Sequence, residues 1–329
     1  MKIFFVDKNW SELADDDSRM LSQVKRRLTT HDGAVEVSAP ELADVVLLQE
    51  KFSYKDFRYI DNLLKDPVIS QFSEKVFTIN CDDCATGLLR GLYTSLPVSR
   101  FSPGIHAAIP YMEYPNELVF SSSDRHCLPS FLAGWRGNTR SNALRLRMIE
   151  ALKSNRRFCL ETTDSWLNHH TEEKKTYVDV MLNAKFSLCP AGWAPVSFRI
   201  YESMALGRCP VILADEFVPP SGPDWRSFAL FFPENKIGRL ADFLYQREHL
   251  YEQLGNAARQ AWDRSFAPGF VEDYISEILL CLIRNAPKTT KRMEVARWKS
   301  SKLYWSNRWT LPQRVVNKAV KFSKSLVAN

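Results

Sequence analysis

The sequence predicts an α/β protein made of two doubly wound domains in series, followed by a basic helical segment. Short apolar runs alternate with segments of helical spacing in residues 1–80, and the same alternation returns from residue 132 onward. Between these regions, prolines interrupt the chain from residue 97 to residue 129. Alternating strands and helices favour a parallel sheet with helices on both faces, so each region is expected to form one such sheet.

The first alternating region opens with KIFFVD, an apolar run typical of a buried strand. The expected strands are 2–7, 44–48 and 75–80, and the expected helices are 18–28 and 57–64. The composition turns polar at residues 121–130, which is typical of a domain boundary. We therefore expect an N-terminal Rossmann-like domain over residues 1–128.

The second alternating region opens with LAGW and contains a strongly amphipathic segment soon afterwards. The expected strands are 132–135, 157–162, 185–190, 210–215 and 228–232, and the expected helices are 142–153, 172–183, 196–206, 236–247, 249–266 and 270–284. We place a second Rossmann-like domain at 129–285 and a basic aromatic helical tail at 286–329. Such folds bind ligands at the carboxyl ends of their strands.

The composition is that of an ordinary globular protein. The 329 residues are 45% hydrophobic and 25% charged, which is enough apolar material for two cores. No apolar run reaches the roughly 18 residues that a membrane span needs. The N-terminus is too short and too charged for a signal peptide, and seven irregularly spaced cysteines form no disulfide framework. These observations predict a cytoplasmic protein.

The net charge of +6 is concentrated at the C-terminal end of the chain. From Arg284 onward there are twelve Lys or Arg residues against a single acid, Glu294, and aromatic residues are interleaved among them. Cations with aromatics suit an anionic membrane surface, such as the inner face of the cytoplasmic membrane. A solvated helical cap that packs its aromatics on the body explains the same pattern. No nucleic-acid-binding module accompanies the charge, so nucleic acid is not an expected partner.

Several common active-site motifs are absent from the sequence. It contains no GxGxxG after a strand, no P-loop lysine and no GxSxG elbow. Cys81 and Cys84 lack the second ligand pair that a metal site would need, so no metal cofactor is expected.

One segment, SFRIYE, carries an unusual set of polar residues at the start of an expected helix. Ser197 and Arg199 stand where unpaired backbone N–H groups bind phosphate well. Glu202 lies three residues further along the same face, where a carboxylate could accept hydrogen bonds from ribose hydroxyls. An N-cap serine with an Arg–Glu surface pair explains the same spacing, and spacing alone favours this second interpretation.

A wider pattern surrounds this segment. The chain reads KFSLCPAG, SFRIYESMALG, RCPVILAD and VPPSGPDW in that order, and LAGWRGNTRSNALRLRMIEAL lies upstream. This ordered set resembles the exostosin family of glycosyltransferases, and the resemblance covers residues 132–225. It implies a GT-B architecture, in which two Rossmann-like domains face each other across a cleft. It also implies inverting, metal-independent transfer from a nucleotide-diphosphate sugar, mostly a UDP-sugar.

The resemblance implies roles for particular residues. Ser197 and Arg199 are expected at the donor diphosphate, and Glu202 at the ribose. The upstream arginine of the family has three candidates in this chain, of which the last fits best by its distance from Gly134: Arg136, Arg140 and Arg145.

The general base is expected in the first domain, after a strand. Asp82 and Asp83 rank first because they follow the expected strand 75–80 as a pair of acids. His106, in a proline-bounded loop, is an alternative, and Asp7 and Glu50 also follow expected strands.

The expected function is transfer of a sugar to a hydroxyl of a glycan or lipid-linked glycan acceptor. Because the chain lacks the membrane anchor of animal and plant members, we expect a bacterial relative that acts in surface polysaccharide or lipopolysaccharide synthesis. The alternative is a catalytically silent binding or scaffold subunit of a polysaccharide-assembling complex.

Overall fold

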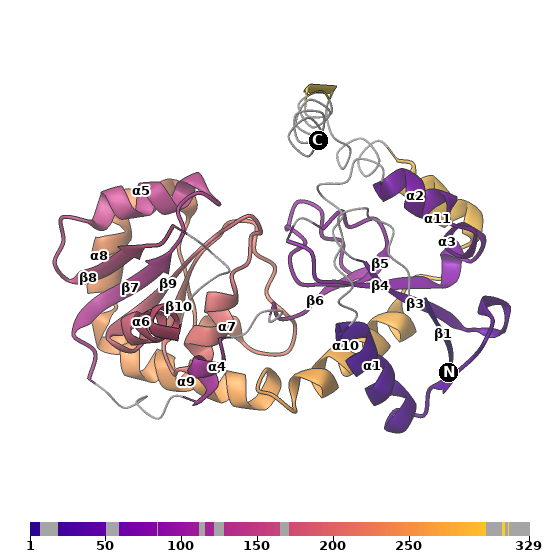
Figure 1. Ribbon diagram of the computed structural model, residues 1–329, viewed down its shortest axis with the longest axis horizontal. Coiled ribbons are helices and arrows are strands. Elements are labelled where there is room, and N and C mark those ends of the chain that lie inside the picture. The colour runs from indigo at the N-terminus through magenta and orange to yellow at the C-terminus, as the bar shows by residue number, and fades with distance from the viewer. Residues whose placement is uncertain are drawn as a thin grey trace, which may run out of the picture. The chain divides into compact units, whose positions relative to one another are not determined.

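The computed structural model describes residues 1–6, 19–50, 59–83, 85–111, 116–121, 128–164, 171–300, 311–312 and 315. The chain divides into two compact units. The first unit comprises residues 1–93, 102–106 and 282–329, and the second comprises residues 94–101 and 107–281. Figure 1 shows a sheet with flanking helices in each unit, so the predicted pair of parallel α/β domains is confirmed.

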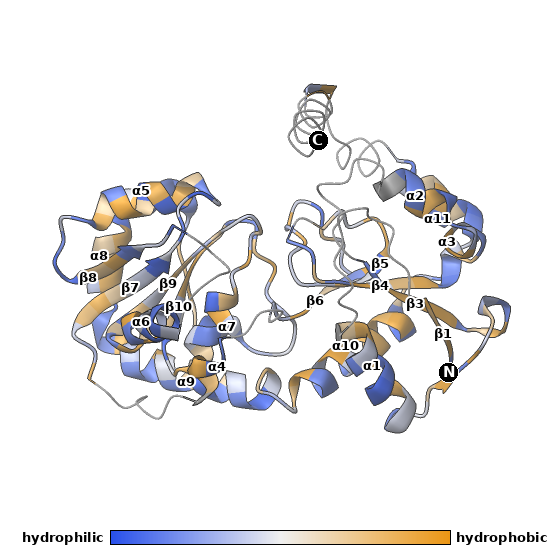
Figure 2. Ribbon diagram, viewed as in Figure 1, coloured by the Kyte–Doolittle hydropathy of each residue, from blue (hydrophilic) through white to orange (hydrophobic). Residues whose placement is uncertain are grey.

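The first unit is built on a six-stranded sheet of order β2-β1-β3-β4-β5-β6. Neighbouring strands from β2 to β5 pair in parallel. The strands are β1 (Lys2–Val6), β2 (Val35–Glu36), β3 (Val45–Glu50), β4 (Val76–Asn80), β5 (Arg90–Tyr93) and β6 (His106–Ala108). Every residue of β3 and β4 is buried, as expected for parallel strands covered on both faces. Figure 2 shows β1 and β3 as predominantly hydrophobic ribbons.

The helices of the first unit follow from local sequence signals. They are α1 (Arg19–Thr30), α2 (Tyr59–Lys65), α3 (Pro67–Gln71) and α11 (Lys291–Trp298). Asp66 caps α3 by accepting hydrogen bonds from the backbone N–H groups of Val68 and Ile69, at 2.9 and 3.1 Å. Proline at the first position of α3 completes a common helix start.

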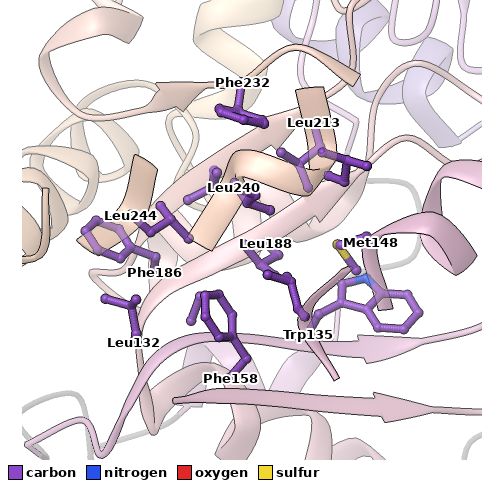
Figure 3. Packing of buried hydrophobic residues seen from close by; sticks show 14 of the residues in the cluster. Leu132, Trp135, Met148, Phe158, Phe186, Leu188, Leu213, Phe232, Leu240 and Leu244 are labelled. Atoms are coloured by element: carbon purple, nitrogen blue, oxygen red, sulfur yellow. The ribbon is translucent and has the colours of Figure 1, made fainter. Parts of the chain in front are cut away.

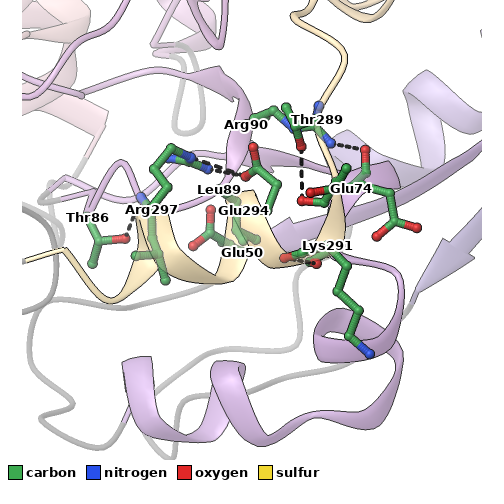
Figure 4. A network of polar contacts seen from close by, with 12 residues as sticks. Glu50, Glu74, Thr86, Leu89, Arg90, Thr289, Lys291, Glu294 and Arg297 are labelled. Carbon is green, nitrogen blue, oxygen red and sulfur yellow. Dashed lines mark hydrogen bonds and ion pairs between the residues drawn. The ribbon is translucent and has the colours of Figure 1, made fainter.

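Helix α11 comes from the expected tail but packs on the first unit. Its Trp298 is buried in the same core as Val46 and Ile69. Next to this core, Arg297 makes an ion pair with the buried Glu294 at 2.7 Å, and Figure 4 shows both in a polar network that includes Arg90. The described part of the tail therefore packs on the first unit, where Trp298 completes the core.

The second unit is built on a five-stranded sheet of order β11-β10-β9-β7-β8, paired in parallel throughout. Its strands are β7 (Phe131–Gly137), β8 (Phe158–Thr162), β9 (Ala184–Pro190), β10 (Cys209–Leu213) and β11 (Leu230–Phe231). Its helices are α4 (Glu117–Ser121), α5 (Ala143–Leu152), α6 (Thr171–Leu182), α7 (Phe198–Ala205), α8 (Leu240–Tyr245), α9 (Tyr251–Ser265) and α10 (Val271–Asn285), of which α10 continues into the first unit.

The core of the second unit lies between its sheet and the helices α5 and α8. Figure 3 shows the buried side chains that fill it, from strands β7 to β10, from the residue after β11 and from helices α5 and α8: Leu132, Trp135, Met148, Phe158, Phe186, Leu188, Leu213, Phe232, Leu240 and Leu244. Burying such side chains contributes roughly 1.5–3 kcal/mol each, so this core fixes the strand ends that carry the site. Within the described part of the chain, no helix is long and apolar enough to cross a membrane.

Candidate active site

The candidate site lies at the carboxyl ends of two neighbouring parallel strands of the second unit. Strands β7 and β9 pair in parallel, so the loops that follow them meet at one edge of the sheet. Asn142, which caps α5, donates a side-chain hydrogen bond to the carbonyl of Gly192 at 3.1 Å and ties the two loops together. The start of α7 follows the second loop, so a helix N-terminus lies at the same edge.

Arg145 spans both loops. Its Nε donates to the carbonyl of Ala191 at 3.1 Å, and its Nη1 donates to the carbonyl of Asn138 at 2.8 Å. A Cβ atom on Gly192 would lie 2.8 Å from Arg145 Nη2, so a larger residue at this position would shift the guanidinium. Of the three candidate upstream arginines, Arg145 is the one whose side chain joins the loops around the start of α7.

Arg136 and Arg140 have different environments. The Arg136 side chain forms an ion pair with Glu161 of β8, which offsets its charge, although its backbone carbonyl accepts a hydrogen bond from Arg199. Arg140 has an exposed side chain, and its backbone N–H donates to the side chain of Asn138 at 2.7 Å. The Arg136 backbone therefore contacts Arg199 at the candidate site, whereas the Arg140 side chain is exposed to solvent.

Ser197 is the N-cap of α7. Its backbone is extended (φ −136°, ψ 136°), and its Oγ accepts a hydrogen bond from the backbone N–H of Arg199 at 3.3 Å. This geometry is what an N-cap serine provides, and it keeps the hydroxyl beside the first N–H groups of the helix. Those N–H groups and the helix dipole make this end of α7 attractive to an anion.

Arg199 is a buried cation with an unsatisfied donor. Its side chain is only 6% exposed and lies against two aromatic rings, with its guanidinium carbon 5.8 Å from the Trp135 ring and 4.6 Å from the Tyr177 ring. Nη2 donates to the carbonyl of Arg136, whereas the buried Nη1 has no hydrogen-bond partner among the described residues. A buried charged donor without a partner is costly, so the arrangement favours an anion at this position.

Glu202 lies one turn deeper in α7 and is 4% exposed. Its carboxylate accepts a hydrogen bond from the Tyr177 hydroxyl and another from the backbone N–H of Asn116. Burial raises the pKa of Glu202, while the Tyr177 hydrogen bond and the Arg199 charge lower it. A carboxylate has about four acceptor positions, so these two contacts leave capacity for a further hydroxyl donor.

The sequence did not identify two residues that organise this site. Tyr177 of α6 contacts both Arg199 and Glu202, and Trp135 of β7 lies within 6 Å of the Arg145 and Arg199 guanidinium groups (5.9 and 5.8 Å). Both residues fall in elements that the sequence predicts, but nothing in their local spacing indicates that they meet α7.

The base candidates lie in the first unit. Asp82 and Asp83 follow β4 at the carboxyl end of the sheet; Asp82 is buried, and its backbone N–H donates to Asn80 Oδ1 at 2.9 Å. Asp83 is half-buried in the turn that follows. Their position at the end of a parallel strand matches the expected location, and their role as the base stays a prediction.

His106 lies in a strand rather than in the expected loop. It begins β6, is buried, accepts a hydrogen bond from the backbone N–H of Ser102 at 3.1 Å and lies edge-on to the Tyr93 ring. Burial lowers the pKa of His106 to about 3. The imidazole is therefore neutral at neutral pH, and its role as an alternative base stays a prediction.

No group of three or more His, Cys, Asp or Glu side chains that could hold a metal ion occurs among the residues with described positions.

The two parallel-sheet α/β units, one of which carries a cationic helix start at its strand ends, have the elements of a GT-B fold. Residues 71–247, more than half of the chain, match the Exostosin GT47 domain. The chain belongs to this family, so the resemblance seen in the sequence is confirmed.

Several relatives with assigned names come from plants. The chain is 40% identical over 76 residues to the probable glucuronosyltransferase GUT1 of Oryza sativa subsp. japonica, covering 22% of this chain and 18% of that protein. It is 44% identical over 70 residues to the probable glucuronoxylan glucuronosyltransferase IRX7 of Arabidopsis thaliana, covering 21% and 16%. It is 37% identical over 127 residues to the probable glucuronosyltransferase 47 A of Physcomitrium patens, covering 36% and 28%. The matches thus span less than a third of each relative.

Solved structures with a distant likeness include HepE of Anabaena in complex with UDP, with a TM-score of 0.44 and 11% identity over 85% of this chain and 100% of that one. TarM has a TM-score of 0.42 and 11% identity, covering 80% of this chain and 58% of that one.

Proposed function

We propose that the protein is an inverting glycosyltransferase that moves a sugar from a UDP-sugar to a hydroxyl of a glycan acceptor. The observation that carries this proposal is the buried Nη1 of Arg199, which lies without a described partner next to the capped start of α7. A diphosphate supplies the anion that this donor lacks, and it also suits the N–H groups of the helix start.

The remaining contacts fit the rest of a nucleotide. With the diphosphate at Ser197 and Arg199, the nucleoside extends along α7, and its ribose hydroxyls donate to the Glu202 carboxylate. Arg145, held between the two loops, adds a second cation at the diphosphate. The names of the plant relatives favour a glucuronosyl or xylosyl donor, and both sugars are carried into the test below.

The proposed reaction is a single displacement at the anomeric carbon. The bond from this carbon to the acceptor oxygen forms as the bond to the diphosphate oxygen breaks, which releases UDP. The acceptor hydroxyl gives its proton to a carboxylate, for which Asp82 and Asp83 stay the candidates. Arg199, Arg145 and the dipole of α7 stabilise the charge that develops on the departing diphosphate.

The C-terminal segment supports a location at the inner face of the cytoplasmic membrane. Residues 301–329 carry six Lys and Arg residues and no Asp or Glu, together with aromatic residues that include Trp305 and Trp309. Such a segment attracts anionic lipid. We therefore infer a lipid-linked or lipopolysaccharide-type acceptor in surface polysaccharide synthesis.

A panel of nucleotides and nucleotide sugars tests the donor. Thermal unfolding of the full chain is followed with UDP, GDP, ADP and CMP, then with UDP-glucuronate, UDP-xylose, UDP-glucose and UDP-galactose, and release of UDP is measured for each sugar. We expect uridine nucleotides to raise the melting temperature and at least one UDP-sugar to be hydrolysed slowly. Stabilisation by another nucleotide alone would contradict the UDP assignment. Stabilisation by UDP-sugars with neither hydrolysis nor transfer would favour the scaffold alternative.

A further inference from the structure

Trp193 differs from the other tryptophans that the structure describes. Its side chain is 55% exposed, whereas Trp135, Trp225, Trp262 and Trp298 are all buried. More than half of this residue is open to solvent, and a large aromatic surface exposed beside a site suggests a binding surface. Trp193 lies in the loop between β9 and α7, four residues before the N-cap Ser197.

The backbone on both sides of Trp193 is held in place. Arg145 binds the carbonyl of Ala191, Asn142 binds the carbonyl of Gly192, and the N–H of Gly192 donates to the carbonyl of Ala194 at 3.0 Å. Ala194 and Val196 are buried and anchor the loop on its far side. The loop therefore presents the indole from a fixed backbone, and the two residues before Trp193 lie beside the guanidinium of Arg145.

The position of the indole along the chain indicates which part of a donor it meets. In the proposed seat, the nucleoside runs from Ser197 along α7 toward Glu202. The sugar is attached to the other end of the diphosphate, on the side of the loop that precedes Ser197. Trp193 is the large aromatic residue of that loop.

We propose that Trp193 binds the sugar ring of the nucleotide-sugar donor by stacking its indole on the C–H face of the ring. This inference rests on the proposed donor seat and adds the residue that recognises the sugar. A flat aromatic face suits a pyranose ring, whose axial hydrogens form an apolar surface, while the polar edge stays free for hydrogen bonds.

Comparing UDP with UDP-sugars separates a contact with the sugar from a contact with the uracil ring. Calorimetry on the full chain measures the dissociation constants for UDP, UDP-glucuronate, UDP-xylose, UDP-glucose and UDP-galactose. The variants are Trp193→Ala, Trp193→Phe and the control Phe270→Ala, whose side chain in the same unit is 56% exposed. Because both positions are exposed, neither truncation should unfold the chain.

For the UDP-sugar that wild type binds most tightly relative to UDP, Trp193→Ala should weaken binding about tenfold and leave UDP binding within about twofold. Trp193→Phe should keep most of the affinity, and Phe270→Ala should match wild type. An equal loss of affinity for UDP and the UDP-sugars would show that the indole contacts the nucleoside or diphosphate, not the sugar, and would overturn the proposal. Unchanged affinities in Trp193→Ala, or a wild type that binds UDP and every UDP-sugar equally, would also overturn it. If wild type binds none of these ligands, the result would instead contradict the proposed donor-binding site at the start of α7.

Discussion

The hydroxyl of Tyr177 donates a hydrogen bond to the Glu202 carboxylate, while the ring of the same residue lies 4.6 Å from the Arg199 guanidinium carbon. One side chain of α6 therefore contacts the cation and the acid that α7 places at the candidate site. Tyr177 acts as a positioning residue: its ring confines Arg199, and its hydroxyl favours the charged form of Glu202.

The hydroxyl of Tyr177 should control the pH range of donor binding. Its hydrogen bond lowers the pKa of Glu202 against the upward effect of burial, so Tyr177→Phe should raise that pKa further. If the carboxylate accepts ribose hydroxyls, UDP affinity falls as the acid protonates, and the acidic limb of the profile should move to higher pH. Calorimetry from about pH 5 to about pH 8 measures this shift.

Tyr245→Phe is a matched control, because Tyr245 also has a hydroxyl that hydrogen-bonds a side chain, at 2.9 Å from Asn155, but lies on α8. Its profile should overlay that of wild type. Identical profiles for Tyr177→Phe and wild type would show that the hydroxyl does not act on donor binding.

The three upstream arginines should differ in their effect on UDP. Arg145→Ala removes a cation that is held at the candidate diphosphate position, so UDP binding should weaken at least about tenfold. Arg140→Ala removes an exposed side chain and should change binding less than about twofold. Uridine has no phosphate, so it serves as a control for effects that do not involve the diphosphate. Its binding should change little in either variant. If Arg140→Ala lost more UDP affinity than Arg145→Ala, the diphosphate could not lie at Arg145.

Local periodicity predicts most of the second unit because its strands are apolar runs and its helices α7, α9 and α10 carry clear apolar stripes. The expected strand 185–190 and helix 196–206 correspond to β9 and α7. In contrast, β5 reads RGLY and β6 reads HAA, which are too short and too polar at their ends for a pattern to show. These strands form because neighbouring strands and buried contacts supply their partners, and such tertiary effects override local propensity.

The same distinction holds for the site. Ser197, Arg199 and Glu202 come from one helix start, so spacing alone places them on one face. The contacts of Tyr177 and Trp135 depend on how α6 and β7 pack against α7, which no local pattern contains. The burial that lowers the pKa of His106 likewise arises from tertiary packing, which the local sequence does not contain.

His106 should make stability sensitive to acid. Its pKa in the fold is about 3, below the value of about 6.5 in an unfolded chain, so the unfolded state binds more protons between these values. Stability should therefore fall as pH drops, by about 2 kcal/mol between about pH 7 and about pH 5 from this residue. Denaturant unfolding of wild type and His106→Gln at both pH values measures how much the free energy of unfolding of each protein changes with pH. A variant whose stability falls as steeply as that of wild type would exclude this linkage.

Two truncations separate folding from membrane attachment. Deleting residues 288–329 removes the buried Trp298 and should cost the first unit about 3–5 kcal/mol. Deleting residues 301–329 keeps α11 and removes six cations, so thermal stability should stay close to that of wild type. Flotation with phosphatidylglycerol-containing vesicles should then decrease for the shorter deletion, and neither form should float with phosphatidylcholine alone. Equal flotation of wild type and the 301–329 deletion would contradict membrane attachment through this segment.

The central claim is that the start of α7 binds a uridine diphosphate whose ribose lies against Glu202. The most direct measurement compares the dissociation constants of UDP and 2′-deoxy-UDP for wild type and Glu202→Gln. We predict that wild type prefers UDP by about tenfold, because hydrogen bonds to a charged group contribute about 1.5–3 kcal/mol, and that Glu202→Gln loses most of this preference. The full preference in Glu202→Gln, or a wild type that does not distinguish the two nucleotides, would contradict the account.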